Sequence, residues 1–161
     1  MAATPEIKIV FNERNPLDVS ISKIKHDYLD GLPNHCRDIE CQEQAALYWG
    51  NFSVPIEQLE KSLKKSKNIA NVISKVMQNV TYLPVSYEDL YYSDHMVEEW
   101  QRVMRFVGRD DVAQNLTLDF IKSKITHIAT HPPDRSENIA NYDEVKKSLT
   151  GTEFEKLLYY P

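Results

Sequence analysis

The sequence predicts an α/β protein in which two or three strands form a parallel sheet among many helices. Two apolar runs, at residues 6–11 and 80–90, are typical of strands. The segments between and after them repeat apolar residues at helical spacing. A strand, then helices, then a strand requires a crossover connection, which makes the two strands parallel and is right-handed in nearly all known cases.

Length and composition restrict the architecture and the classes of partner. The 161 residues suit a single domain over residues 1–161, and 42% hydrophobic and 27% charged residues are ordinary for a globular protein. The net charge of −5 argues against a nucleic-acid binder that uses a broad basic surface. No apolar window is long enough to predict a membrane span, and the opening MAATPEIK lacks the regions of a secretory signal. We therefore expect a cytoplasmic protein without a membrane span.

The first predicted strand spans residues 6–11. On one face it carries Ile7, Ile9 and Phe11. Val10 lies on the opposite face, so both faces have apolar side chains, which is typical of a strand in a parallel sheet.

The first helix has clear start and stop signals. Asn15 is predicted to be its N-cap, Pro16 its first residue and Asp18 the acid of a capping-box variant. Gly31 and Pro33 predict its end. Its buried stripe is predicted to consist of Leu17, Ile21, Ile24 and Tyr28.

The segment before the second strand is predicted to be helical apart from a polar loop at residues 34–41. Helices are predicted at 45–49, 55–65 and 68–78. One face of the last is lined by Ile69, Val72, Ile73 and Val76. A run of lysines is interpreted as a solvated face and consists of Lys61, Lys64, Lys65 and Lys67.

The second strand lies within residues 80–90. Pro84 has no N–H to donate, which predicts an edge position or a strand end. An amphipathic helix follows at 94–107, and Gly108 is its predicted C-cap. The apolar face of this helix consists of Met96, Val97, Trp100, Val103, Met104 and Val107.

The rest of the chain is predicted to contain three more helices. One spans residues 117–128, and a polar loop follows it. Asn141 and Glu144 form a capping-box start for a helix at 142–149. The same device, with Thr152 and Glu155, predicts a short last helix.

The junction after the first strand is the predicted anion site. Ligands of open α/β sheets bind beyond the carboxyl ends of the strands, and a helix N-terminus there attracts negative charge. Arg14 at the strand end can hold a phosphate with two hydrogen bonds, and Ser22, one turn beyond Asp18, can donate a third. The alternative is a well-capped helix whose Arg14 pairs with a surface carboxylate.

Other candidate sites are weaker. His35, Cys36 and Cys41 offer three zinc ligands where a structural site needs four, so no metal is predicted. Three further histidines have no motif context and are interpreted as surface or hydrogen-bonded residues: His26, His127 and His131.

Three segments resemble one family. RNPLDVSIS, residues 14–22, resembles the 3′-phosphate-binding strand–helix element of the sulfotransferases that use 3′-phosphoadenosine 5′-phosphosulfate (PAPS), with the same arginine-to-serine spacing of eight. YLPVSYEDLYYSDHMVEEWQRVMRFVG, residues 82–108, is similar to the Tyr-Glu-Asp-Leu element of that family and the helix after it. NYDEVKKSLTGTEFEKLL, residues 141–158, is similar to the closing helices of its algal, plant and bacterial-type members.

The resemblance implies the C-terminal half of a P-loop-like sulfotransferase domain, which transfers a sulfuryl group from PAPS to an acceptor hydroxyl or amine. Arg14 and Ser22 would hold the 3′-phosphate of PAPS or of its product, 3′,5′-adenosine bisphosphate. Tyr87 would contact the adenine; its alternative role is that of a core tyrosine. Arg135 and Ser136 would belong to the loop that closes over the nucleotide.

The chain departs from this family in the part that performs the chemistry. The loop that binds the 5′-phosphosulfate, with its lysine, and the catalytic base precede the arginine strand in the family, and no G-x-x-x-x-G-K-[ST] pattern occurs here. The catalytic residues and the acceptor are therefore unassigned. The missing unit would expose a sheet edge and an apolar face, so we expect a homodimer, a missing half supplied in trans, or a rearrangement.

Two functions follow from these expectations. The first is a sulfotransferase-like protein that keeps the 3′-phosphate side of the donor site, and it would lie in the Golgi lumen if the chain derives from a membrane-anchored member. The second is a non-enzymatic interaction module on a sulfotransferase scaffold.

Overall fold

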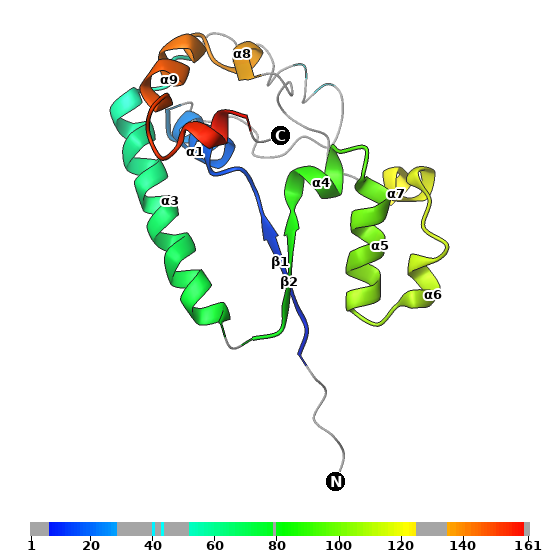
Figure 1. Cartoon of the computed structure of the whole chain (residues 1–161). Coiled ribbons are helices and arrows are strands. Elements are labelled where there is room, and N and C mark those ends of the chain that lie inside the picture. Colours follow the sequence, from blue (N-terminus) through cyan, green and yellow to red (C-terminus); the bar gives the residue numbers. More distant parts are fainter. Residues whose placement is uncertain are drawn as a thin grey trace. The chain divides into compact units, whose positions relative to one another are not determined.

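A computed structural model describes residues 7–28, 40, 43, 52–78, 80–124 and 135–159. These residues form two strands, eight α-helices and one 3₁₀ helix (Figure 1). The strands β1 (Ile9–Glu13) and β2 (Tyr82–Ser86) pair in parallel. The predicted α/β class, with a parallel two-stranded sheet among many helices, is confirmed.

The register of the sheet aligns the carboxyl ends of the two strands. Ile9 pairs with Tyr82 at one end and Glu13 with Ser86 at the other. The prediction placed the first strand too early, because Ile7 lies before β1 and is 80% exposed.

The outer edge of β2 is blocked at Pro84. This residue pairs with Phe11 in the ladder and has no N–H to offer a further strand. Its carbonyl oxygen accepts a hydrogen bond of 2.9 Å from Arg102 Nη2. The predicted edge position of Pro84 is therefore confirmed, and β2 is protected against pairing with another strand there.

The chain divides into two compact units, and each is described by itself. The first unit comprises Met1–Arg14 and Ile69–Lys124. The second comprises Asn15–Asn68 and Ile125–Pro161.

The second unit contains α1 (Pro16–Tyr28), the first half of α3 (Ile56–Met77), α8 (Arg135–Asn138), α9 (Tyr142–Leu149) and the 3₁₀ helix η1 (Glu155–Leu158). The Ser62 hydroxyl donates to the Ser20 hydroxyl at 2.9 Å, which links α3 to α1. The core of the second unit consists of Leu17, Ile21, Ile24, Phe52, Val54, Leu59, Leu63, Ile139, Val145, Leu149 and Leu158.

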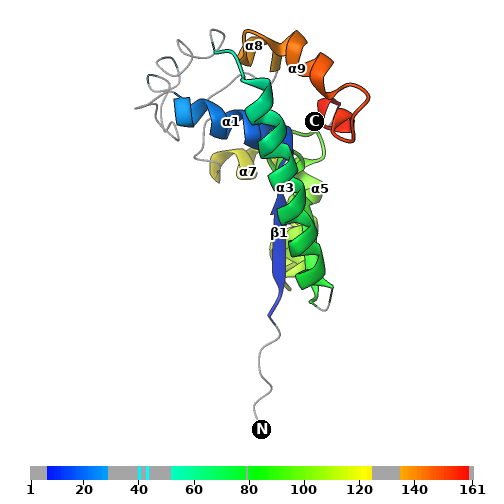
Figure 2. The same cartoon turned by 90° about the vertical axis from the view of Figure 1, so that its left-hand side faces the viewer.

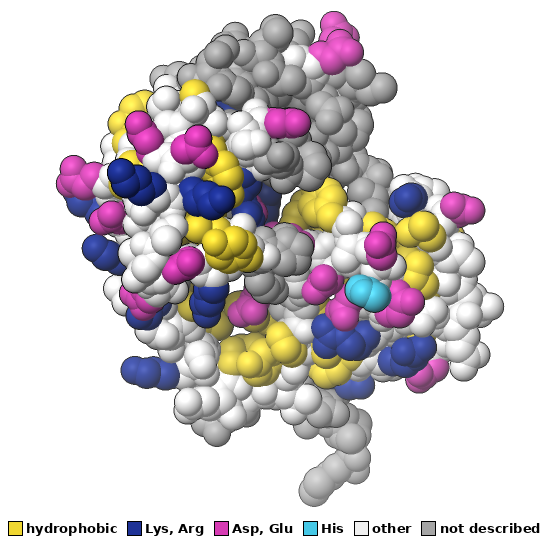
Figure 3. All heavy atoms as spheres, turned by 45° about the horizontal axis from the view of Figure 1, so that its top comes forward, with side chains coloured by type: hydrophobic (Ala, Val, Ile, Leu, Met, Phe, Trp, Pro, Cys, Tyr) yellow, Lys and Arg dark blue, Asp and Glu magenta, His cyan; other side chains and the backbone are white. Residues whose placement is uncertain are grey.

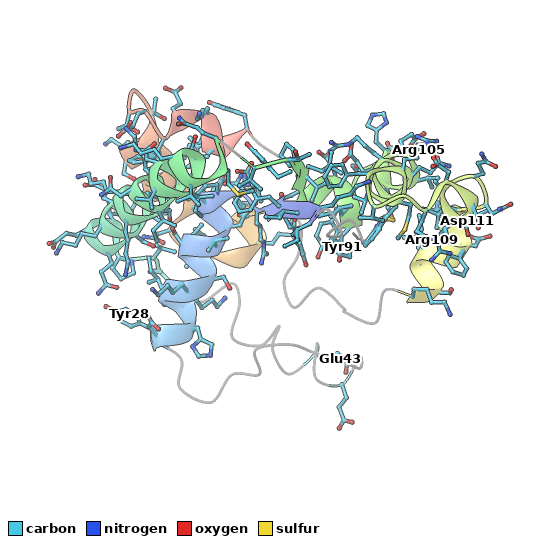
Figure 4. The ribbon with its side chains drawn as sticks, turned by 90° about the horizontal axis from the view of Figure 1, so that it is seen from below. Tyr28, Glu43, Tyr91, Arg105, Arg109 and Asp111 are labelled. Carbon is cyan, nitrogen blue, oxygen red and sulfur yellow. The ribbon has the colours of Figure 1, made fainter. Side chains whose placement is uncertain are left out.

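The predicted stripe of α1 is confirmed at three of its four positions. Tyr28 is the correction, because its side chain is 53% exposed at the end of α1 (Figure 4). Its hydroxyl accepts a hydrogen bond from Gln58 Nε2, and its ring packs against Phe52 with centroids 5.9 Å apart. The last turn of α1 thus contacts the core through the ring of Tyr28.

The α9 helix has the predicted bounds but a different arrangement at its start. Asn141 makes no side-chain cap to the helix backbone. Its amide oxygen instead accepts from the N–H of Val54, and its amide nitrogen donates to the carbonyl of Val54 and to Glu144. One side chain therefore ties the segment before α3 to the start of α9. The last predicted helix is confirmed as a short element, but it is a 3₁₀ helix.

The first unit continues from the sheet into α4 (Tyr87–Tyr91), α5 (Met96–Phe106), α6 (Asp110–Ala113) and α7 (Leu118–Lys124). Val85, Leu90 and Val103 form its small core. On the predicted apolar face of α5, Met96 and Val103 are buried, whereas Val107 is 41% exposed and does not belong to the core.

Gly108 ends α5 as predicted. Its φ of +83° is a left-handed conformation that favours glycine. The N–H of Gly108 donates to the carbonyl of Arg105, and the N–H of Arg109 donates to that of Met104. This pair of bonds is the Schellman motif, which satisfies two carbonyls at the helix end.

The α3 helix is continuous where the sequence predicted two helices (Figure 2). The face lined by Ile69, Val72 and Val76 is exposed by 50%, 62% and 66%. Apolar side chains also reach the surface elsewhere in the molecule (Figure 3). The predicted lysine run is solvated, and three of its members pair with carboxylates, namely Lys61 with Glu57, Lys64 with Glu60 and Lys67 with Glu153.

Several predictions lie outside the described residues. They are the polar loop at 34–41 apart from residue 40, the helix at 45–49, the end of the helix predicted at 117–128, and the first part of the polar loop predicted at 129–141. The second part of that loop is described, and the prediction is wrong there, because Arg135–Asn138 form the helix α8. His35, Cys36 and Cys41 also lie outside the described residues. In the described part of the chain, no helix has the length and apolar character that crossing a membrane requires.

Candidate functional site

The parallel register brings Arg14 and Tyr87 together. The last pair of the ladder is Glu13 with Ser86, so the next residue of each strand is Arg14 on one side and Tyr87 on the other. The guanidinium carbon of Arg14 lies 4.9 Å from the centroid of the Tyr87 ring, over its face. Such a cation–π contact contributes about 0.5–2 kcal/mol. A shift of the register would separate the two residues.

Further aromatic rings surround Tyr87. The Tyr91 ring lies 4.8 Å from it at 44°, and the Tyr92 ring lies 5.8 Å from it at 63°. Tyr91 in turn meets the edge of Trp100, whose indole N–H donates to the carbonyl of Leu90 at 2.9 Å (Figure 4 labels Tyr91). Tyr87 is partly buried. This exposure is intermediate between that of a core tyrosine and that of an open ligand contact, the two roles that were predicted.

Charges of both signs lie around this aromatic group. Glu88 is 8% exposed, and its carboxylate accepts a hydrogen bond of 3.2 Å from the Ser86 hydroxyl. Burial raises the pKa of Tyr92 far above its usual value, hydrogen bonding with Tyr87 raises it further, and the charges of Arg14 and Glu88 act in opposite directions. Burial also raises the pKa of Tyr91. Tyr91 and Tyr92 are therefore neutral groups at neutral pH.

Sequence analysis did not select Glu88 or Tyr92. The available signal was their place in YEDLYY, directly after the second strand, where side chains gather at the carboxyl end of a parallel sheet.

The start of α1 is capped as predicted. The side-chain oxygen of Asn15 accepts from the N–H of Leu17 at 2.9 Å, and its side-chain nitrogen donates to the carbonyl of Leu157 at 3.0 Å. Asn15 is only 1% exposed, so both contacts are fixed. Ser22 lies two turns into α1 and is partly buried. The cap thus gives α1 a defined first turn close in sequence to Arg14.

Arg135 has an intramolecular partner. It is the first residue of α8, and its guanidinium donates to both carboxylate oxygens of Asp18, at 2.7 and 3.0 Å. It also donates to the carbonyl of Leu158 at 3.0 Å. Burial lowers the pKa of Arg135, but the hydrogen bonds and charges of Asp18 and Tyr142 outweigh it and raise the pKa. Contact with a nucleotide stays a prediction, and it would have to compete with Asp18.

Lys25 is a buried cation that sequence analysis did not select. It is 1% exposed on α1, and its ammonium nitrogen lies 5.7 Å from the centroid of the Phe52 ring. Burial lowers its pKa from 10.5 to about 7. An apolar-looking helix face gave no sign that a lysine would lie in it.

The predicted site residues fall into two groups. Arg14 and Tyr87 meet in the first unit, whereas Ser22, Arg135 and Ser136 belong to the second. Ser136 is the exposed second residue of α8. Among the described residues, no group of three or more His, Cys, Asp or Glu side chains could hold a metal ion.

Comparison with known proteins gives no match: no family model fits the sequence, and neither a curated protein nor a solved structure is significantly similar to the chain. The resemblance to the sulfotransferases therefore stays a prediction from three sequence segments.

Proposed function

We propose that the chain is a sulfotransferase-like protein that binds the 3′-phosphate of PAPS or of 3′,5′-adenosine bisphosphate with Arg14. The observation that carries this proposal is the contact of Arg14 with Tyr87 at the carboxyl ends of two parallel strands. This end of a parallel sheet is where ligands of such folds bind. The guanidinium can form two parallel hydrogen bonds to a phosphate, a geometry that lysine cannot reproduce.

The other residues enter the proposal by different routes. Ser22 enters through its spacing from Arg14 in the sequence and would donate its hydroxyl to the same phosphate. Arg135 and Ser136 would contact the nucleotide after Arg135 exchanges Asp18 for it. The reaction served is sulfuryl transfer to an acceptor hydroxyl or amine, and this chain offers no residue to which we assign its base.

Calorimetric titration with 3′,5′-adenosine bisphosphate tests the proposal. Arg14→Ala removes a charge-assisted contact, and we expect a loss of about 1.5–3 kcal/mol, or roughly 10- to 150-fold in affinity. Arg105→Ala is the matched control, since Arg105 is an exposed arginine of α5 that donates to Gln101 (Figure 4). It should bind like the wild type. Equal affinity of Arg14→Ala and the wild type would refute the assignment of Arg14.

The position of the phosphate can be tested separately. Adenosine 3′-monophosphate should bind, and adenosine 5′-monophosphate should bind more weakly, because Arg14 is proposed to hold the 3′ group. If Arg14→Ala still binds adenosine 3′-monophosphate more tightly than adenosine 5′-monophosphate, another residue distinguishes the two nucleotides.

The second candidate function is an interaction module. It is favoured by the exposure of Ile69, Val72 and Val76 on α3, because contiguous apolar surface of this kind often marks a protein interface. The partner would be a second copy or a chain that supplies the missing half. Sedimentation velocity over a range of concentrations tests the first case, and Val72→Glu should then shift the chain towards monomer. A wild-type chain that stays monomeric at high concentration would exclude the homodimer.

A further inference from the structure

The ring of Tyr87 is partly buried and packs against three side chains. The Arg14 guanidinium lies over its face, and the rings of Tyr91 and Tyr92 lie against it at 4.8 and 5.8 Å. An adenine that stacks on an aromatic ring needs an open face of that ring. In Tyr87, the side chain that the sequence resemblance assigned to the base, Arg14 already covers one face of the ring.

Tyr92 has the opposite character. It is 55% exposed, although its ring contacts that of Tyr87. Its backbone is fixed, because its N–H donates to the carbonyl of Glu88 at 2.8 Å and so closes the last turn of α4. Burial and hydrogen bonding with Tyr87 raise the pKa of the Tyr92 hydroxyl. Tyr92 thus combines a fixed backbone and a ring contact with Tyr87 with more than half of its surface open to solvent.

The two neighbours of Tyr92 also suit a nucleotide. The ring of Tyr92 and the guanidinium of Arg14 both contact the ring of Tyr87. An aromatic surface and a cation therefore both lie against Tyr87. A purine 3′-phosphate has the matching pair of groups, a flat base and a dianion joined by one ribose. Stacking alone accepts any purine, because every base has a π face.

We propose that Tyr92, rather than Tyr87, is the residue on which the base of the nucleotide stacks, and that Tyr87 is a positioning residue that holds Arg14. This inference rests on the proposed function, because it concerns the same nucleotide site. It names a purine nucleoside 3′-phosphate as the ligand class, with 3′,5′-adenosine bisphosphate as the member to be tested.

The test compares two ligands, so that the base is measured apart from the phosphates. Calorimetry is performed with 3′,5′-adenosine bisphosphate and with its abasic analogue, 1-deoxyribose 3,5-bisphosphate. Tyr92→Ala should lower the affinity for the nucleotide about 10-fold and leave the affinity for the abasic analogue unchanged. Tyr92→Phe, which keeps the ring, should bind both like the wild type. Tyr87→Leu should lower the affinity for both ligands by the same factor, because it removes the ring that positions the Arg14 guanidinium.

Tyr28→Ala is the matched control. Tyr28 is 53% exposed, nearly as much as Tyr92, and it belongs to the second unit. It should alter the affinity for neither ligand. A second measurement on the wild type avoids any effect of a variant on folding: in spectra of ring-labelled tyrosine, the nucleotide should shift the Tyr92 ring protons upfield and the abasic analogue should not.

Each outcome separates the inference from the proposed function. If Tyr92→Ala keeps the wild-type preference for the nucleotide, the stacking role of Tyr92 is refuted while the phosphate site remains. The same holds if the wild type binds both ligands equally or the Tyr92 protons do not shift. If the wild type binds neither ligand, the proposed function fails, and the inference fails with it.

Discussion

The ion pair of Asp18 with Arg135 should be the strongest polar contact in the second unit. Its two N–O distances are 2.7 and 3.0 Å, and the side chains are only 21% and 14% exposed. Breaking a fully buried pair costs about 3–5 kcal/mol, whereas an exposed pair contributes about 0–1 kcal/mol. Since both side chains are mostly but not fully buried, we expect Asp18→Asn to lower the free energy of unfolding by about 2–3 kcal/mol.

A double-mutant cycle isolates the pair from its surroundings. Urea unfolding of the wild type, Asp18→Asn, Arg135→Ala and the double variant should give a coupling energy of about 1.5–2 kcal/mol. Arg135→Ala alone should cost more than the coupling, because it also removes the bond to the carbonyl of Leu158.

The control for this cycle is the bidentate pair of Arg109 with Asp111, which is exposed (Figure 4). Arg109→Ala should leave the urea midpoint unchanged. A coupling near zero between Asp18 and Arg135 would refute the reasoning from burial. It would also mean that Arg135 can leave Asp18 at little cost, as contact with a nucleotide requires.

Three further predictions concern Lys25, Gly108 and the exposed face of α3. Burial lowers the pKa of Lys25 from 10.5 to about 7, so the unfolded chain binds more protons between these values and stability rises with pH there. Urea unfolding at pH 7 and 9.5 should show a rise of up to about 3 kcal/mol that Lys25→Met lacks; parallel pH dependence in both proteins would contradict this. Gly108→Ala should cost about 1 kcal/mol, since a Cβ meets no atom within 4 Å but the φ of +83° disfavours it; Gly108→Asn should cost less, and an unaffected Ala variant would exclude the left-handed turn. Val72→Gln should change the free energy of unfolding by less than about 0.5 kcal/mol, against about 3 kcal/mol for the buried Leu59→Ala, and similar losses would mean that the α3 face is covered.

The sequence predicted best those elements whose signals are local. Asn15 and Pro16 start α1, and Gly108 ends α5, because caps depend on a few neighbouring residues. The parallel pairing also followed from the order of the elements. From these it was possible to expect Arg14 and Tyr87 at one end of the sheet.

The sequence could not predict which partner a side chain chooses from a distant segment. Asp18 looked like a capping residue, yet it binds Arg135. Asn141 was expected to cap its own helix, yet it binds the backbone of Val54. Tyr92 was not selected, because its exposure depends on how Tyr87 and Arg14 fill the space beside it. In each case the local pattern allows several partners, and tertiary packing decides among them.

The blocked edge at Pro84 gives the sheet a direction of growth. In the described part of the chain the sheet has two strands, and the side of β2 that faces away from β1 lacks a donor at Pro84, where Arg102 occupies the acceptor. The block at Pro84 therefore disfavours a further strand beside β2 and favours pairing beside β1. If such a strand joins in parallel, its own carboxyl end arrives next to Arg14. The block at Pro84 thus protects the β2 edge against aggregation and also favours an arrangement in which a further strand ends beside Arg14.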